Sequence, residues 1–213
     1  MPVIERNENS EILVPRLIVL RGSPGIGKST VTSKVCALNS AKKKTAISVD
    51  AMQHIDLRKP SKDKDKLGIK HSALLTKSFL SEGFDVVLDY VFDDITDLQN
   101  VIDYIKNDSE PRVHFYLQMF YLDAPVEKVV KRNQSRSGKR GEYMNTALLR
   151  KLYQKVSATK GTIENEIILD TSDLSAKQTA RTILSCSTAL LDANTLIEVE
   201  LPEEDAKRAL ADD

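Results

Sequence analysis

The residues with the most distinctive chemistry lie in one glycine-rich segment near the amino end of the chain. Residues 22–29 read GSPGIGKS, which fits the pattern G-x-x-x-x-G-K-[ST]. Glycine lets a backbone turn tightly and expose N–H groups that can surround a phosphate. In this pattern the lysine bridges the β- and γ-phosphates of a nucleoside triphosphate, and the serine hydroxyl binds Mg²⁺. We therefore expect ATP and Mg²⁺ as cofactors, with Lys28 also catalytic and Ser29 also a metal ligand. The expected nucleotide contacts in this segment are Gly22, Ser23, Pro24, Gly25, Ile26, Gly27, Lys28, Ser29 and Thr30.

Two aspartates follow apolar, β-rich runs. Asp50 comes directly after 45–49, and Asp89 ends 85–89. Because ligands bind at the carboxyl ends of strands in an open parallel sheet, we expect both carboxylates beside the glycine loop. Transfer of a phosphoryl group to a hydroxyl needs one carboxylate that accepts the proton and one that helps to hold Mg²⁺. We assign Asp50 as the base and Asp89 as the metal ligand. The two roles could also be shared or exchanged, and either residue could instead cap a helix or a turn.

A basic segment follows later in the chain. Arg132 and Arg136 are four residues apart and share a face if the preceding helix continues, and Lys139 and Arg140 follow on a glycine-flanked turn. We predict a lid at about 132–146 that closes over the triphosphate and excludes water, with Arg132 and Arg136 stabilising charge during transfer. The alternative is a solvated basic surface.

The elements that must position these residues alternate along the chain. Val- and Ile-rich runs separated by helix-length segments predict βαβ units, a five-stranded, mainly parallel sheet and helices on both faces, which is the α/β P-loop NTPase class. We expect this domain to cover 1–192, with a tail at 193–213. Asp93 and Asp94 suit a helix start, and residues 57–70 read as a loop. The predicted strands are 16–20, 45–49, 85–89, 113–122 and 166–169, and the predicted helices are 28–39, 72–81, 98–106, 125–133, 147–157 and 176–191.

Composition limits the kinds of partner. The chain has 31 basic and 31 acidic residues, so no net charge draws it to nucleic acid or to an anionic membrane. Its apolar runs are too short to span a bilayer, its first residues do not resemble a signal peptide, and Cys36 and Cys186 have no ligand-like spacing. We therefore expect a cytoplasmic protein without a membrane partner.

Four segments resemble those of small P-loop kinases, in the group of the polynucleotide 5′-kinases, the chloramphenicol phosphotransferases and the zeta-toxin-like kinases. These segments are SVDAMQ at 48–53, VVLDYVFDD at 86–94, the stretch 131–156 and IILDTSDLS at 167–175. The resemblance implies the base role for Asp50, the metal role for Asp89, nucleotide-phosphate contacts for Arg132 and Arg136, and a base contact for Thr171. The chain departs from the polynucleotide kinases at Gln53, where they carry an arginine that reads the acceptor phosphate.

Two acceptors and one different class of function follow from this pattern. A nucleic-acid 5′-hydroxyl is favoured by the resemblance and by the basic stretch 58–70, whereas the neutral charge and an aromatic content of 5% favour a small-molecule hydroxyl. The third hypothesis is a nucleotide-binding switch module without transfer. A switch has no need of a hydroxyl base at Asp50, so a kinase is the leading interpretation.

Overall fold

The computed structural model describes residues 14–52, 62–107, 112–135, 144–186 and 191–192. Five parallel strands form the sheet in the order β2-β3-β1-β4-β5, and a short sixth strand, β6, pairs antiparallel with the beginning of β4. The predicted α/β class with a five-stranded parallel sheet is therefore confirmed, with β6 as an addition. The strands are β1 (Arg16–Arg21), β2 (Lys44–Ser48), β3 (Asp85–Asp89), β4 (Tyr116–Asp123), β5 (Ile167–Asp170) and β6 (Leu191–Asp192).

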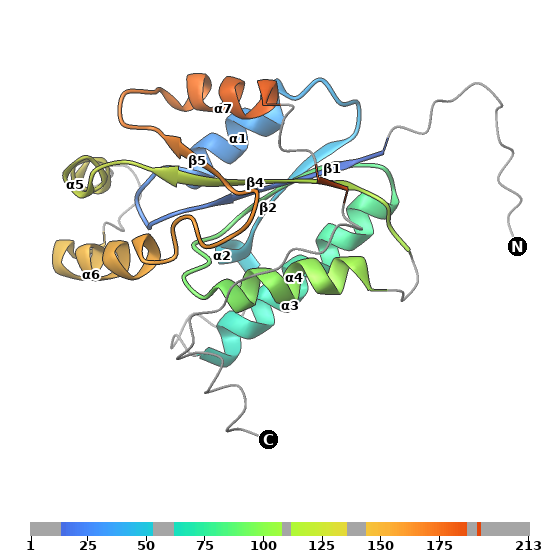
Figure 1. Cartoon of the computed structure of the whole chain (residues 1–213), viewed down its shortest axis with the longest axis horizontal. Helices are drawn as coiled ribbons and strands as arrows, with labels where there is room; N and C mark the ends of the chain where they lie inside the picture. Colours follow the sequence, from blue (N-terminus) through green and yellow to red (C-terminus); the bar gives the residue numbers. More distant parts are fainter. Residues whose placement is uncertain (1–13, 53–61, 108–111, 136–143, 187–190, 193–213) are drawn as a thin grey trace, which may run out of the picture.

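Helices cover both faces of the sheet (Figure 1). The α1 and α7 helices pack against each other over one face, while α3 and α4 pack together over the other. The helices are α1 (Lys28–Leu38), α2 (Val49–Met52), α3 (Lys62–Ser81), α4 (Ile95–Lys106), α5 (Val126–Gln134), α6 (Thr146–Ser157) and α7 (Ala176–Ser185). None of the helices in the described part of the chain combines the length and the apolar composition needed to cross a membrane.

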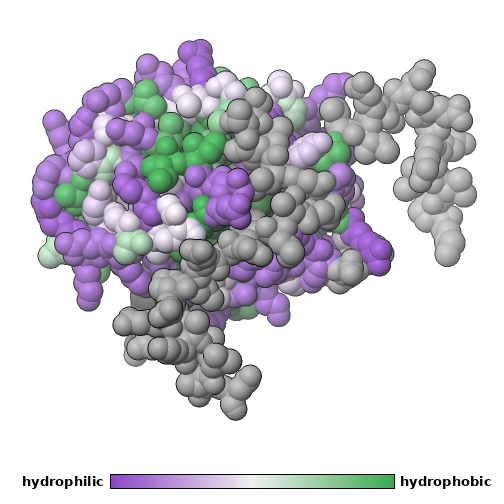
Figure 2. All heavy atoms as spheres, in the orientation of Figure 1, coloured by the Kyte–Doolittle hydropathy of each residue, from purple (hydrophilic) through white to green (hydrophobic). Residues whose placement is uncertain are grey.

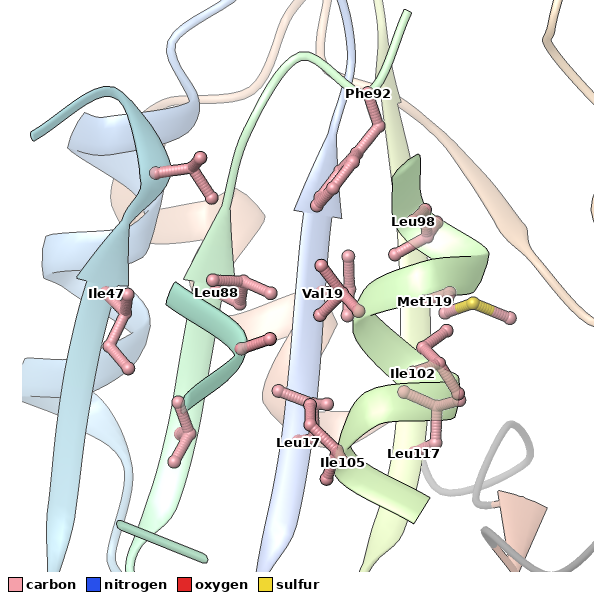
Figure 3. Packing of buried hydrophobic residues seen from close by; sticks show 14 of the residues in the cluster. Leu17, Val19, Ile47, Leu88, Phe92, Leu98, Ile102, Ile105, Leu117 and Met119 are labelled. Carbon is pink, nitrogen blue, oxygen red and sulfur yellow. The ribbon is translucent and has the colours of Figure 1, made fainter. Parts of the chain in front are cut away.

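The central strand explains why both faces are covered. Successive side chains of a strand point to opposite faces, and in β1 both sets are apolar and fully buried. Leu17 and Val19 belong to the core beneath α3 and α4, and Ile18 and Leu20 belong to the core beneath α1 and α7. Figure 3 shows the first of these cores, where side chains of α4 reach those of β1 and β4. In the view of Figure 2 the surface is mostly hydrophilic, with hydrophobic side chains gathered mainly over β5.

Two sequence predictions were wrong. Residues 62–70 do not belong to a loop but begin α3, because Ile69 is buried and extends the apolar stripe through Ala73 to Leu80 by one more turn. The last predicted helix ends at Ser185 instead of 191, and Leu191 and Asp192 form β6. Asp94 caps α4 as predicted, since its side chain accepts a hydrogen bond from the backbone N–H of Thr96 at 2.9 Å.

Candidate active site

The glycine loop joins the central strand β1 to α1 in a backbone shape that needs glycine. Gly22, Gly25 and Gly27 have φ angles of 141°, 80° and 110°, which L side chains rarely adopt. A Cβ atom at Gly22 would also lie 2.6 Å from the carbonyl oxygen of Leu122 on β4. The loop therefore turns tightly at the carboxyl edge of the sheet and leads directly into the amino end of α1, where backbone N–H groups favour an anion.

Lys28 is the first residue of α1 and is 6% exposed. Its Nζ atom donates hydrogen bonds to the carbonyl oxygens of Gly22 at 2.9 Å and Ser23 at 3.2 Å. The ammonium is thus held across the glycine loop by the loop's own backbone. This is where the sequence pattern places a lysine that bridges terminal phosphates.

Asp89 ends β3, between β1 and β2, and is 1% exposed. The hydroxyls of Ser29 and Ser48 donate to its Oδ1 atom over long separations of 3.4 and 3.3 Å. Burial raises the pKa of Asp89 above its ordinary value, and the negative charge of Asp50 acts in the same direction, whereas the nearby Thr32 hydroxyl and the charge of Lys28 oppose the rise. A nearby cation would therefore favour the ionised carboxylate.

The donor set formed by Ser29 and Asp89 fits Mg²⁺, which binds hard oxygen ligands and usually keeps several waters. Within residues 14–52, 62–107, 112–135, 144–186 and 191–192, no group of three acidic, histidine or cysteine side chains could hold a metal ion. The other ligands of a Mg²⁺ ion at this position would thus be phosphate oxygens and water.

Asp50 lies in the short helix α2 and is exposed. It lines a cleft of about 480 Å³ together with Lys28 and Ser29, so the structure brings the predicted base to the glycine loop. Because α2 begins at Val49, Asp50 lies inside the helix and is not its amino-terminal cap. In the described part of the chain, neither a hydrogen bond nor an ion pair engages its carboxylate.

The remaining walls of this cleft come from several other elements. The loop between β3 and α4 contributes Tyr90, Val91 and Asp93, and it is held in shape by Phe92, which is buried at a φ of 43°. Figure 3 shows Phe92 at the end of this core, above Leu98. The other lining residues are Asp65 of α3, Asn133 of α5, Met144 in the segment before α6, Leu152 of α6, and Pro24, Gly25 and Gly27 of the glycine loop.

Sequence reasoning missed Asp65 as a cleft residue because it assigned residues 57–70 to a loop. The available signal was the helical spacing from Ile69 to Ala73 and Leu80, which extends back to Asp65 at a further interval of four. Asn133 was also missed; its side-chain amide donates to the carbonyl oxygen of Met144 at 2.7 Å and so joins α5 to the residue before α6.

Arg132 lines a second hollow of about 240 Å³ on the other side of the glycine loop. Its guanidinium donates to the carbonyl oxygen of Ile26 at 3.0 Å, to Thr171 Oγ1 at 3.1 Å and to the Thr171 carbonyl oxygen. Arg132 therefore ties α5 to the glycine loop and to the turn after β5. The other lining residues are Gly25, Gly27, Thr30, Val31, Ser135, Leu174, Ala176 and Thr179.

Thr171 is 3% exposed and its hydroxyl has two partners already, since it accepts from Arg132 and donates to the carbonyl oxygen of Asp123 at 2.9 Å. Its hydroxyl thus positions the arginine at the edge of this hollow. The flat guanidinium and the apolar side chains of Val31, Leu174 and Ala176 give the hollow a shape and polarity suited to a planar nucleobase. The predicted catalytic residue Arg136 lies outside the described residues.

Comparison with known proteins agrees with this geometry. The family model of an AAA domain matches residues 17–159. No curated protein sequence matches the chain. Among solved structures, a chain of the Pnkp1/Rnl/Hen1 RNA repair complex is 20% identical with a TM-score of 0.56, and the match covers 73% of this chain and 48% of that one. This chain therefore spans about half the length of that RNA repair protein.

Two further structures match over nearly their whole length. A gluconokinase from Sinorhizobium meliloti 1021 is 17% identical with a TM-score of 0.55, covering 80% of this chain and 90% of that one. The tunicamycin resistance protein of Deinococcus radiodurans is 13% identical with a TM-score of 0.57, covering 88% and 99%. These likenesses concern the fold. Since the family match covers more than half of the sequence and includes the glycine loop, Asp50, Asp89 and Arg132, the chain belongs to this AAA domain family and has the P-loop kinase fold.

Proposed function

We propose that this chain is an ATP- and Mg²⁺-dependent kinase that transfers the γ-phosphoryl group to a hydroxyl of an acceptor. The observation that carries the proposal is the exposed carboxylate of Asp50, which opens onto the same cleft as Lys28 and Ser29 and has no partner among the described residues. A protein that only binds nucleotide has no need of a carboxylate in that position, whereas a kinase needs one to accept the hydroxyl proton.

The residues divide the reaction among them. The glycine loop and Lys28 hold the β- and γ-phosphates, and the hollow beside Arg132 takes the nucleobase. Ser29 and Asp89 would hold Mg²⁺, which offsets negative charge on the phosphates. Asp50 accepts the proton as the acceptor oxygen bonds to the γ-phosphorus, the bond from that phosphorus to the oxygen of the β-phosphate breaks, and ADP leaves.

The acceptor belongs to one of two classes. The resemblance to polynucleotide 5′-kinases and the likeness to an RNA repair protein support a nucleic-acid 5′-hydroxyl end. The likeness to a gluconokinase and a tunicamycin resistance protein supports a small-molecule hydroxyl. We retain both as acceptors for the first test.

The test is transfer of label from γ-labelled ATP, with Mg²⁺, to 5′-hydroxyl DNA and RNA oligonucleotides and to a pool of small hydroxyl compounds. Asp50→Asn should lower transfer by about 10³-fold or more while ATP still binds, because only the base is removed. Asp103→Asn is the matched control, since Asp103 is exposed on α4 and bonds only Gln99 in the described structure. Tight ATP binding without transfer by the unmodified protein would instead support the switch module.

A further inference from the structure

The cleft has an acidic wall that the transfer reaction does not fully use. Among the described residues that line it, Asp50, Asp65 and Asp93 are negative and Lys28 is the one positive side chain. The ammonium of Lys28 is directed to the backbone of the glycine loop, on the side where the phosphates bind. The acceptor side of the cleft is therefore negatively charged in the part of the chain that the structure describes.

Besides the proposed base Asp50, the acidic residues Asp93 and Asp65 differ in their surroundings. Asp93 forms an ion pair with Lys155 of α6 at 2.8 Å, so its charge is matched from outside the cleft. Asp65 is exposed on α3, and no hydrogen bond or ion pair engages its carboxylate within the described ranges. Within the described ranges, Asp65 thus presents a negative charge without a bonded partner to the same space as the base Asp50.

The negative potential extends beyond the cleft along α4. Asp97 lies in the first turn of α4, four residues after Asp93, and is half-buried, and its pKa is raised to about 6. Burial is the main cause, and the charges of Asp94, Asp93 and Asp65 add to it while Lys66 opposes them. The carboxylates of the α3 and α4 ends are therefore close enough to influence one another.

Apolar side chains also line the cleft. Met144 and Leu152 line the cleft on the α6 side, and Val91 and Tyr90 line it on the β3 side. The volume of about 480 Å³ lies within the range of small-molecule sites, roughly 300–1,000 Å³. An occupant that suits this lining combines a carbon framework with hydroxyl or ammonium groups.

We propose that the acceptor is a small polyhydroxy compound that carries an ammonium group, of the amino alcohol or amino sugar class, and that Asp65 binds this ammonium. This inference rests on the proposed kinase function and gives the substrate class of that site. Asp50 accepts the proton of the reacting hydroxyl, and Asp65 orients the acceptor through a charge-assisted hydrogen bond. A nucleic-acid end would place its own phosphates against the same carboxylates, which like charges disfavour.

The experiment compares acceptors that differ only in charge. Glucosamine, other amino sugars, aminocyclitols and amino alcohols are each offered with γ-labelled ATP and Mg²⁺ beside their N-acetylated counterparts, which keep every hydroxyl but lose the cation. The 5′-hydroxyl oligonucleotides are tested in parallel. We expect transfer to at least one free amine, with kcat/KM at least about tenfold higher than for its N-acetyl form.

The role of Asp65 is tested with that same pair of compounds. Asp65→Asn should raise KM for the amine by about 10- to 100-fold with little change in kcat or in KM for ATP, and should remove the preference for amine over N-acetyl. Calorimetric binding of the amine to the ADP-loaded protein should weaken by the same factor. Asp103→Asn is again the control and should leave all these values unchanged.

The outcomes separate the two proposals. Transfer to an oligonucleotide, or equally to amine and N-acetyl compounds, would overturn the amine proposal and leave the kinase intact. An unchanged KM in Asp65→Asn would likewise overturn the role of Asp65. No transfer to any acceptor, with ATP binding intact, would overturn the kinase function and this inference with it.

Discussion

The two ends of β3 carry aspartates with opposite surroundings. At its amino end, Asp85 accepts hydrogen bonds from the backbone and the guanidinium of Arg16 and, at 2.8 Å, from the amide of Asn39. At its carboxyl end, Asp89 is even more deeply buried and receives long contacts from the hydroxyls of Ser29 and Ser48. One carboxylate is saturated by partners within the chain, and the other retains capacity to bind an ion.

This difference distinguishes charged side chains that stabilise the fold through partners in the chain from charged side chains that are available to bind a ligand. Arg21 and Glu166 form another matched pair, with only 1% and 0% of their side-chain surface exposed, and Thr159 accepts further hydrogen bonds from Arg21. Asp50 and Asp65, in contrast, share the cleft without a partner among the described residues. Ligands bind at the carboxyl edge of an open parallel sheet, so carboxylates that gather there are candidates for a functional site.

The sharpest test of this comparison is Asp89→Ala. We expect phosphoryl transfer to fall by about 10³-fold, roughly 4 kcal/mol of barrier, because the ion near the phosphates loses its protein carboxylate. Stability in the absence of nucleotide should not fall by more than about 1 kcal/mol, since the variant removes a poorly solvated charge along with a few weak contacts. Transfer rates across a Mg²⁺ titration and chemical denaturation of the apo protein check the two expectations. Normal transfer with normal Mg²⁺ dependence would remove Asp89 from the metal site.

The matched substitution at the other end of β3 should have the opposite effects, with a loss of stability and little change in phosphoryl transfer. Asp85→Ala removes the carboxylate that the guanidinium of Arg16 and the 2%-exposed amide of Asn39 share, and among the described residues leaves Arg16 only its hydrogen bond to Asn39 Oδ1. We therefore expect a loss of about 2–4 kcal/mol of unfolding free energy. Transfer per folded molecule should stay within about twofold, because this edge of the sheet is far from the glycine loop. Urea denaturation measures the change in unfolding free energy, and kinetics normalised to the concentration of folded protein measure the change in transfer. A large loss of kcat without a loss of stability would contradict the division between the two edges of the sheet.

Arg132 tests a case between these two, since its guanidinium is hydrogen-bonded within the chain and also lines the hollow that we propose for the nucleobase. Arg132→Ala should raise KM for ATP by about tenfold, because the hollow loses one wall and the tie between Ile26 and Thr171. The KM for the acceptor should change little. Nucleotide binding by calorimetry and steady-state kinetics give these values, and Arg181→Ala on the exposed surface of α7 is the control. A selective loss of kcat would favour the phosphate role that the sequence resemblance implies.

The parts of the site that could be predicted from sequence are those fixed by local rules. The glycine loop is determined by backbone angles that few residues other than glycine tolerate. The position of Asp89 could be predicted because it ends a short run of apolar residues, VVL, that forms a strand. Asp65 was missed because the first turns of α3 are mostly polar, and the buried Ile69 is the signal that the helix extends back to them. The partners of Asp85 could not be predicted from the sequence either. Arg16 and Asn39 contact Asp85 only after β1 and β3 have paired.

The smallest expected effect comes from Asp97, whose pKa in the folded protein is about 6 and therefore above the ordinary value of 3.8. A carboxyl with a raised folded-state pKa stabilises the fold while it is protonated, and this contribution is lost as the pH rises from about 4 through 6. The wild-type protein should accordingly lose up to about 1 kcal/mol of stability between pH 5 and pH 7.5 relative to Asp97→Asn, a figure reduced from the full linkage value because the group is half-exposed. Urea denaturation of both proteins at the two pH values measures the difference. Parallel stability curves would mean that the carboxylates at the α3 and α4 ends are screened by solvent, which would weaken the case for an acidic wall beside Asp50.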